Sequence, residues 1–110
     1  MAQTNEEAIV RTYLAGPITG VAHYREHFAR AARELEAAGH TVVNPALIEE
    51  RDDWEWADYM RAALTLMLTC RRVAVLPGWQ ASRGARLELN VAHRLGMDVR
   101  VLESWTRADA

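Results

Sequence analysis

The chain of 110 residues contains no lysine, and all thirteen of its positively charged side chains are arginines. A Schiff-base lysine and the lysine of a Walker phosphate-binding motif are therefore excluded. Cysteine is almost absent too: with Cys70 alone, the chain can form no internal disulfide and no CxxC metal or redox motif. A single cysteine is typical of a protein that works in the reducing cytoplasm.

Other absences limit the expected partners. No apolar run approaches the ~18 residues needed to cross a bilayer, so no membrane partner is expected. The segment Met1–Glu7 is polar and acidic, unlike the basic and then apolar start of a signal peptide. The net charge of −2 gives no overall positive field, and we therefore expect no duplex nucleic-acid partner.

The composition that remains is that of one globular domain. Half of the residues are hydrophobic and a quarter are charged, which excludes general disorder. We expect a single domain over residues 1–110, with its core at about residues 9–102 and a polar tail at each end.

The order of apolar segments predicts the fold class. Short apolar runs predict strands at residues 9–15, 41–43, 72–76 and 98–102, and amphipathic segments predict helices at 22–38, 56–70 and 82–95. Residues 46–55 are predicted to form a loop that can include a helical turn, and the chain from Glu103 is predicted to be loosely held. This alternation predicts a three-layer α/β domain whose parallel sheet of about four strands is flanked by helices.

Such sheets bind ligands at the carboxyl ends of their strands, so the loops after the first three strands are the expected site. The first of these loops, Gly16–Gly20, has two glycines and is typical of a turn that cradles a phosphate or sugar. Ser82 precedes the third helix and is either a plain helix N-cap or part of an anion site with the nearby backbone amides. Gly84 leaves room for a ligand to approach.

Glu88 is the residue that stands out most in the sequence. On a helical wheel Ala85, Val91, Ala92 and Leu95 all lie within about 60° of it, so a carboxylate occupies the centre of an apolar stripe. A buried charge is costly unless it is paired or used. Two interpretations stay open: a structural ion pair with an arginine, and a functional carboxylate that faces the cleft, which we favour.

Two weaker motifs are also present. Residues 23–27 spell HxxEH, an inverted zincin pattern, but no further acidic ligand is placed and a solvated helix face is the expected interpretation. Trp79 follows the third strand, where its ring either stacks on a base or sugar or covers the edge of the core. His40 follows a helix-ending glycine and is expected to be exposed. No metal site is predicted.

Four segments occur in an order that identifies a family. They are Tyr13–Gly20, Asn44–Pro45, Leu76–Trp79 and Ser82–Glu88. Together they resemble the nucleoside 2-deoxyribosyltransferase-like family, and are most similar to its small branch common in phages and prophages. The resemblance spans roughly residues 11–102. It implies a flavodoxin-like or Rossmann-like fold, a homodimer or larger homo-oligomer, and no metal or organic cofactor.

The resemblance also implies an activity and a set of site residues. Family members cleave the N-glycosidic bond of nucleosides or nucleotides, as transferases or hydrolases, through a glutamate that attacks the anomeric carbon, which implies that Glu88 is the nucleophile. The positions implied to bind substrate are Gly16, Pro17, Ile18, Thr19, Gly20, Asn44, Trp79, Ser82 and Gly84.

One departure from the family pattern affects the activity. The aspartate that the family often carries on its second helix, where it assists the leaving base, aligns with Ala63, and a second family aspartate aligns with Arg71. Asp52, Asp53 or a partner subunit remain as substitutes. The alternative is therefore a catalytically weak or inactive module that binds a nucleotide or nucleotide sugar.

Overall fold

The computed structural model describes residues 9–107 and places ten elements along them. The strands are β1 (Arg11–Ala15), β2 (Thr41–Val43), β3 (Arg72–Val75) and β4 (Asp98–Val101). The α-helices are α2 (Tyr24–Ala37), α3 (Trp56–Met67), α4 (Arg83–Arg94) and α5 (Leu102–Thr106), and two short 3-10 helices are η1 (Pro45–Leu47) and η2 (Trp79–Ala81). The predicted strands and long helices are confirmed, with ends that shift by a few residues. The predicted polar tails fall mostly outside the described residues.

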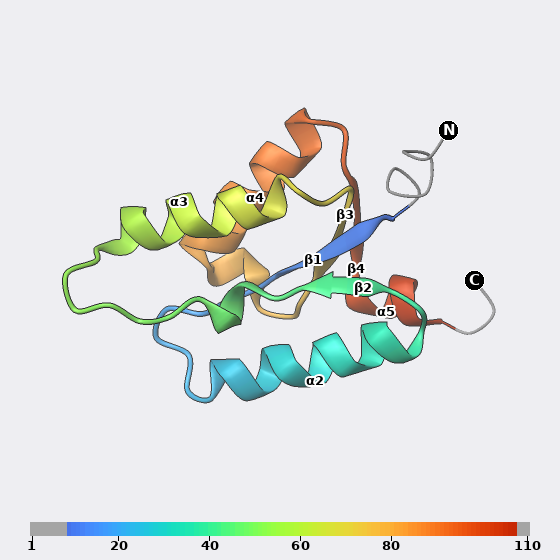
Figure 1. Ribbon diagram of the computed structural model, residues 1–110, viewed down its shortest axis with the longest axis horizontal. Helices are drawn as coiled ribbons and strands as arrows, with labels where there is room; N and C mark the ends of the chain where they lie inside the picture. Colours follow the sequence, from blue (N-terminus) through green and yellow to red (C-terminus); the bar gives the residue numbers. More distant parts are fainter. Residues whose placement is uncertain (1–8, 108–110) are drawn as a thin grey trace.

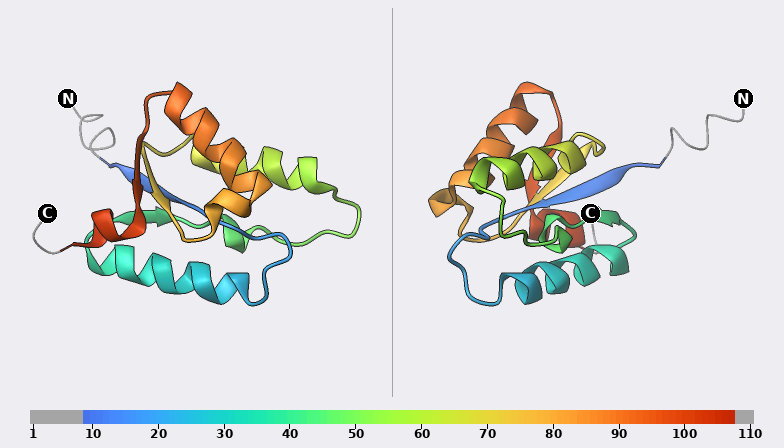
Figure 2. Two further views of the ribbon diagram at one scale, coloured as in Figure 1. Left: turned by 180° about the vertical axis from the view of Figure 1, so that it is seen from behind. Right: turned by 60° about the vertical axis from the view of Figure 1, so that its left-hand side comes forward.

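The four strands form one parallel sheet in the order β2-β1-β3-β4. Tyr13 in the central strand β1 is paired with Val43 of β2 and with Val73 of β3. Helices α2 and α5 cover one face of the sheet, and α3 and α4 cover the other (Figures 1 and 2). The predicted three-layer α/β fold is confirmed.

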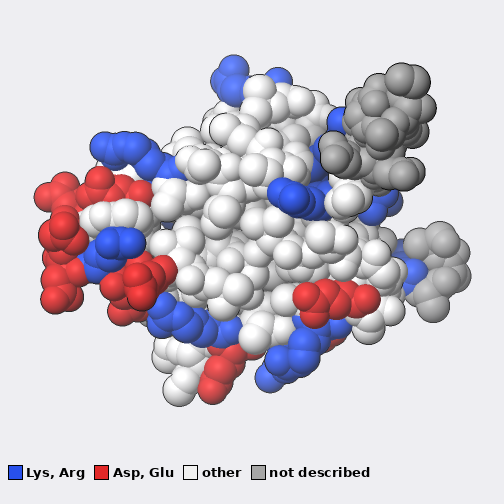
Figure 3. Space-filling view, viewed as in Figure 1, with Lys and Arg blue, Asp and Glu red and all other residues white. Residues whose placement is uncertain are grey.

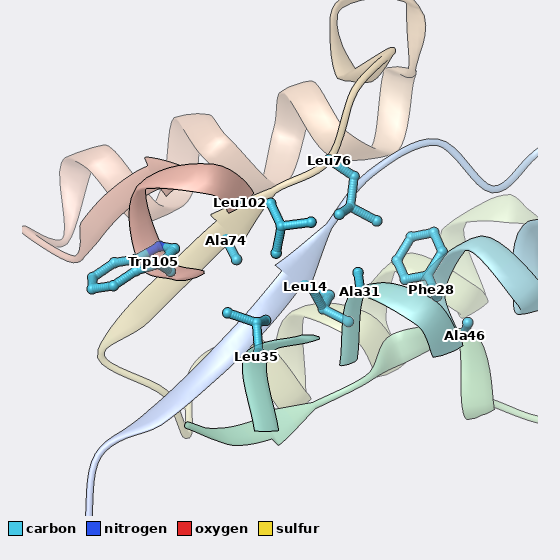
Figure 4. Packing of buried hydrophobic residues seen from close by; sticks show 9 residues of the cluster. All are labelled: Leu14, Phe28, Ala31, Leu35, Ala46, Ala74, Leu76, Leu102 and Trp105. Carbon is cyan, nitrogen blue, oxygen red and sulfur yellow. The ribbon is translucent and has the colours of Figure 1, made fainter. Parts of the chain in front are cut away.

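Each face of the sheet carries its own apolar core, because successive side chains of a strand point to opposite faces. The core under α2 and α5 is made by Leu14, Phe28, Ala31, Leu35, Ala46, Ala74, Leu76, Leu102 and Trp105 (Figure 4). The core under α3 and α4 is made by Tyr13, Ala15, Met67, Cys70, Val73, Val75, Leu89 and Ala92. Tyr13 therefore faces α4, whereas its neighbour Leu14 faces α2.

Three expectations about exposure are wrong. The chain after Glu103 is not loosely held: α5 packs Trp105 into the core, and its indole Nε1–H donates a hydrogen bond to the Val73 carbonyl at 3.0 Å. His40 is half-buried, because its ring bonds Thr12 Oγ1 at 2.9 Å and the Trp105 carbonyl at 3.2 Å. Leu95, which the helical wheel places on the apolar stripe around Glu88, is not buried: it is the C-cap of α4 and remains exposed.

The turn after β1 depends on a glycine. A Cβ on Gly16 would lie 2.8 Å from the Cβ of Leu76, so only glycine allows the ends of β1 and β3 to come this close. Gly16 thereby brings the β1–α2 turn against the segment that leads into α4. Within residues 9–107, no helix is long and apolar enough to span a membrane.

Candidate functional site

A cavity of about 480 Å³ opens at the carboxyl edge of the sheet, on the side of α3 and α4. It is bounded by the β1–α2 turn, by the segment between η1 and α3, and by the facing sides of α3 and α4. Its lining residues are Gly16, Ile18, Thr19, Gly20, Tyr24, Pro45, Ile48, Glu50, Arg51, Asp52, Trp56, Tyr59, Met60, Ala63, Ser82, Gly84, Ala85 and Glu88. The volume is within the range of small-molecule sites.

Glu88 lies at the inner end of this cavity. It comes from the second turn of α4, and only 6% of its surface is exposed. The Tyr13 hydroxyl donates a hydrogen bond to Glu88 Oε2 at 2.5 Å. Oε1 has no hydrogen-bond partner within residues 9–107. Every fully buried side-chain oxygen in that range has such a partner, so Oε1 is not fully buried and must open toward the cavity that Glu88 lines.

These contacts exclude one of the two interpretations of Glu88, the structural ion pair with an arginine, among the described residues. No arginine of the described chain forms an ion pair with it, and its bonded neighbour is the neutral phenol of Tyr13. The carboxyl group is buried and opens into a cavity instead of being neutralised by a cation. This arrangement is typical of a functional carboxylate.

Burial also changes the acidity of both groups. Desolvation raises the pKa of Glu88 to about 7, and the hydrogen bond from Tyr13 lowers that pKa in part. Desolvation, together with the nearby Glu88, raises the pKa of Tyr13 far above its ordinary value. Tyr13 therefore keeps its proton throughout the pH range in which Glu88 titrates, and its hydroxyl remains a donor to the carboxylate.

The structure brings most of the predicted site residues to the cavity. Gly16, Ile18, Thr19, Gly20, Ser82 and Gly84 line it together with Glu88. Ser82 accepts a hydrogen bond from the Ala85 backbone N–H at 3.1 Å, so its side chain acts as the N-cap of α4. A Cβ on Gly84 would lie 3.0 Å from the sulfur of Met60, so a larger residue there would crowd α3.

Three other predicted residues do not line this cavity. Pro17 borders a second cavity, on the α2 face of the sheet. The Asn44 side chain is used to cap η1, where it accepts the Ala46 backbone N–H at 2.9 Å. Trp79 is half-buried against the core under α3 and α4, which corresponds to the second of its two interpretations.

Several functional residues were not predicted from the sequence. Tyr13 does not line the cavity but bonds Glu88, and a hydroxyl in a buried strand is itself a signal because it needs a partner. Tyr24, Trp56 and Tyr59 were not predicted to line the site, since nothing local predicts how the segment before α3 folds back. Ala63 is buried at the cavity wall, as its place on the apolar stripe of the helix predicted.

The histidine pattern does not form a metal site. His23 and His27 are both exposed at the start of α2, and His23 is 3.7 Å from Glu26. Within the described part of the chain, no group of three or more His, Cys, Asp or Glu side chains is arranged to hold a metal ion.

Comparison with known families adds a second line of information. Residues 10–101 match the family described as Domain of unknown function (DUF4406). The chain belongs to this family. The match spans all four strands and ends just before α5.

A solved structure is similar to this DUF4406 chain. It is the 2-deoxyribosyltransferase of the psychrotolerant bacterium Bacillus psychrosaccharolyticus, with a TM-score of 0.63 and 21% sequence identity. The aligned region covers 82% of this chain and 69% of that one. The likeness shows that the two proteins share a fold, which is the flavodoxin-like fold that the sequence motifs implied. No curated protein matches the sequence significantly.

Proposed function

We propose that this DUF4406 protein cleaves or transfers the N-glycosidic bond of a nucleoside or nucleotide, with Glu88 as the nucleophile. The observation that carries the proposal is the Oε1 atom of Glu88, which opens into the cavity while Oε2 is held by Tyr13. The shared fold with a 2-deoxyribosyltransferase and the ordered motifs around Glu88 support the same activity.

The reaction has two balanced steps. In the first, Glu88 Oε1 forms a bond to the anomeric carbon as the bond from that carbon to the base nitrogen breaks. The base leaves with the electron pair and takes up a proton. In the second, water or the nitrogen of another base attacks the anomeric carbon, loses a proton and releases the carboxylate of Glu88. The hydrogen bond from Tyr13 holds the carboxylate in position throughout.

A second function is favoured by one residue. Ala63 lines the cavity at the place where the family resemblance implies an acid, so α3 offers no proton there to the leaving base. Loss of a general acid costs about 10²–10⁴-fold in rate. The alternative is therefore a module that binds a nucleotide or nucleotide sugar in this cavity with little or no turnover.

Base release separates the two functions. Purified protein is incubated with deoxynucleosides, ribonucleosides and their 5′-monophosphates, and free base is quantified by chromatography, with thermal stabilisation by each compound measured in parallel. We expect base release from at least one compound. Thermal stabilisation without release over a long incubation supports the binding module, and the absence of both contradicts both functions.

Tyr13→Phe is expected to shift the pH dependence of base release. Only ionised Glu88 attacks, so kcat/KM for the wild-type protein should rise with pH through about 7 and level off above it. The substitution removes the hydrogen bond that lowers the pKa of Glu88, so the rising limb should move to higher pH. Activity lost at pH 7 should then be partly recovered at pH 9.

Tyr24→Phe is the matched control. Tyr24 also lines the cavity, but its hydroxyl bonds Glu50 at 3.2 Å instead of Glu88. The rising limb of its pH profile should stay at the wild-type position. An unchanged limb in Tyr13→Phe would contradict the role given to Tyr13.

The homo-oligomer and the cytoplasmic location expected from the sequence stay predictions.

A further inference from the structure

The mouth of the cavity is acidic, in contrast to its small and apolar interior. The segment from residue 48 to 55, between η1 and α3, carries five carboxylates and one guanidinium. Figure 3 shows acidic side chains gathered at the end of the molecule that this segment forms. Glu50, Arg51 and Asp52 from this segment line the cavity.

This segment is held in place at two points. The Tyr59 hydroxyl accepts the Arg51 backbone N–H at 2.6 Å and donates to the Arg51 carbonyl at 3.0 Å. The Tyr59 ring also packs edge-on against Trp54, with 4.9 Å between ring centroids. Glu50 Oε2 accepts hydrogen bonds from Tyr24 at 3.2 Å and from Arg25 at 3.5 Å. The residue that follows Arg51, Asp52, is thereby fixed at the cavity mouth.

Asp52 has unused hydrogen-bonding capacity. It forms no hydrogen bond or ion pair with any residue from 9 to 107, whereas Glu50 is engaged by Tyr24 and Arg25. A carboxylate accepts through two oxygens and pairs best with two donors held side by side. The second carboxylate that opens into the same cavity is the buried Glu88, whose Oε1 is free of partners in the described chain.

The inference rests on the proposed function, which determines how a substrate lies between Glu88 at the inner end of the cavity and Asp52 at its mouth. With the anomeric carbon at Glu88, the sugar lies among the small residues Gly16, Ala63 and Gly84. The rest of the ligand must extend toward the mouth. An anionic 5′ group is disfavoured beside the carboxylates of the mouth, so the base is the part that reaches the segment before α3.

We propose that Asp52 is a specificity-determining residue that selects a base with two adjacent N–H donors, and that Tyr59 is the residue that positions it. Guanine presents such a pair, its ring N1–H and its exocyclic amine, on one edge. Hypoxanthine has the same ring system and the N1–H but lacks the amine. Comparing guanine and hypoxanthine nucleosides therefore isolates the second hydrogen bond.

The test measures the affinity ratio for guanosine and inosine, and for their 2′-deoxy forms, by calorimetry with Glu88→Gln, in which turnover is blocked. A hydrogen bond to a charged group corresponds to roughly a 10- to 100-fold preference for the guanine nucleoside. Adding Asp52→Asn should reduce that ratio at least about 10-fold. The matched control is Asp53→Asn, a neighbour that is exposed as Asp52 is but does not line the cavity, and it should leave the ratio unchanged.

Tyr59→Phe tests the positioning role. It keeps the ring against Trp54 but removes both hydrogen bonds to Arg51, so the guanine preference should fall while the affinity for inosine stays within about 2-fold of the parent. Equal affinity for the two nucleosides, no binding of either, or an equal effect of Asp52→Asn and Asp53→Asn would each overturn the inference. The test measures the affinities of nucleosides and does not depend on base release. Absence of base release by the wild-type protein would therefore contradict the proposed function, while the affinity ratios would still test the role of Asp52.

Discussion

Glu88→Gln should lower base release by at least about 10³-fold, because an amide cannot form the glycosyl ester through which the proposed reaction passes. Glutamine keeps nearly the same shape and can still accept the hydrogen bond from Tyr13. The substitution therefore removes the nucleophile without opening a cavity in the core. The loss should appear for every substrate in the rate constant of base release, which is measured by chromatography of the free base under single-turnover conditions.

Two measurements separate this loss from a loss of structure. Glu34→Gln makes the same chemical change on the exposed face of α2 and should retain wild-type activity. The second measurement is the pH dependence of the free energy of unfolding. Burial raises the pKa of Glu88 to about 7 from its usual 4.5, so the folded chain binds the proton more tightly than the unfolded chain does.

The sign of the pH effect follows from that difference. The protonated carboxyl of Glu88 stabilises the folded chain. This contribution to the free energy of unfolding is complete below the pKa that Glu88 has in the unfolded chain, and it is lost as pH rises through about 7. Glutamine does not titrate, so the variant keeps its stability where the wild type loses it. Between pH 4 and pH 8, the free energy of unfolding of Glu88→Gln should rise by about 3 kcal/mol relative to that of the wild type. Base release that persists in a folded Glu88→Gln variant would refute the nucleophile.

Glu88 could be predicted from the sequence because its signal is local. A single helix wheel shows a carboxylate inside an apolar stripe, and burial follows as soon as that stripe packs on a sheet. Its partner Tyr13 was missed because the pairing joins positions 75 residues apart. Only the register of β1 beneath α4 brings the two together. Asp52 and Asp53 were candidates for the missing acid, but the conformation of their segment could not be predicted, since Tyr59 must fold back onto Arg51 to define it.

The end of the fold was predicted wrongly for a different physical reason. The segment after β4 is short, and its α-helix has only five residues, too few for a helical periodicity to be recognised. Leu102 and Trp105 alone carry the packing of α5. The indole of Trp105 also meets the ring of His40 edge-on and the guanidinium groups of Arg72 and Arg100. The contacts with His40 and Arg72 join distant parts of the sequence, so the packing of this segment could not be read from its own residues.

Trp105→Ala is therefore expected to lower the free energy of unfolding by about 3–5 kcal/mol, as for other large-to-small changes in a core. The variant loses the packing of the indole against the core shown in Figure 4 and its hydrogen bond to the Val73 carbonyl. Urea unfolding followed by far-ultraviolet circular dichroism measures the loss. Because α5 lies on the face of the sheet away from the cavity, any variant that remains folded should still bind nucleosides.

Trp105→Phe divides this effect into its two parts. It keeps an aromatic ring in the core but removes the indole N–H, so its loss should be smaller, about 1–2 kcal/mol for the hydrogen bond together with the lost volume. A fall of less than about 1 kcal/mol in Trp105→Ala would mean that α5 is only weakly attached. The α2 face of the sheet would then depend on α2 alone, and the rigid support beneath β1, from which Tyr13 reaches Glu88, would have to come from the α3 and α4 side.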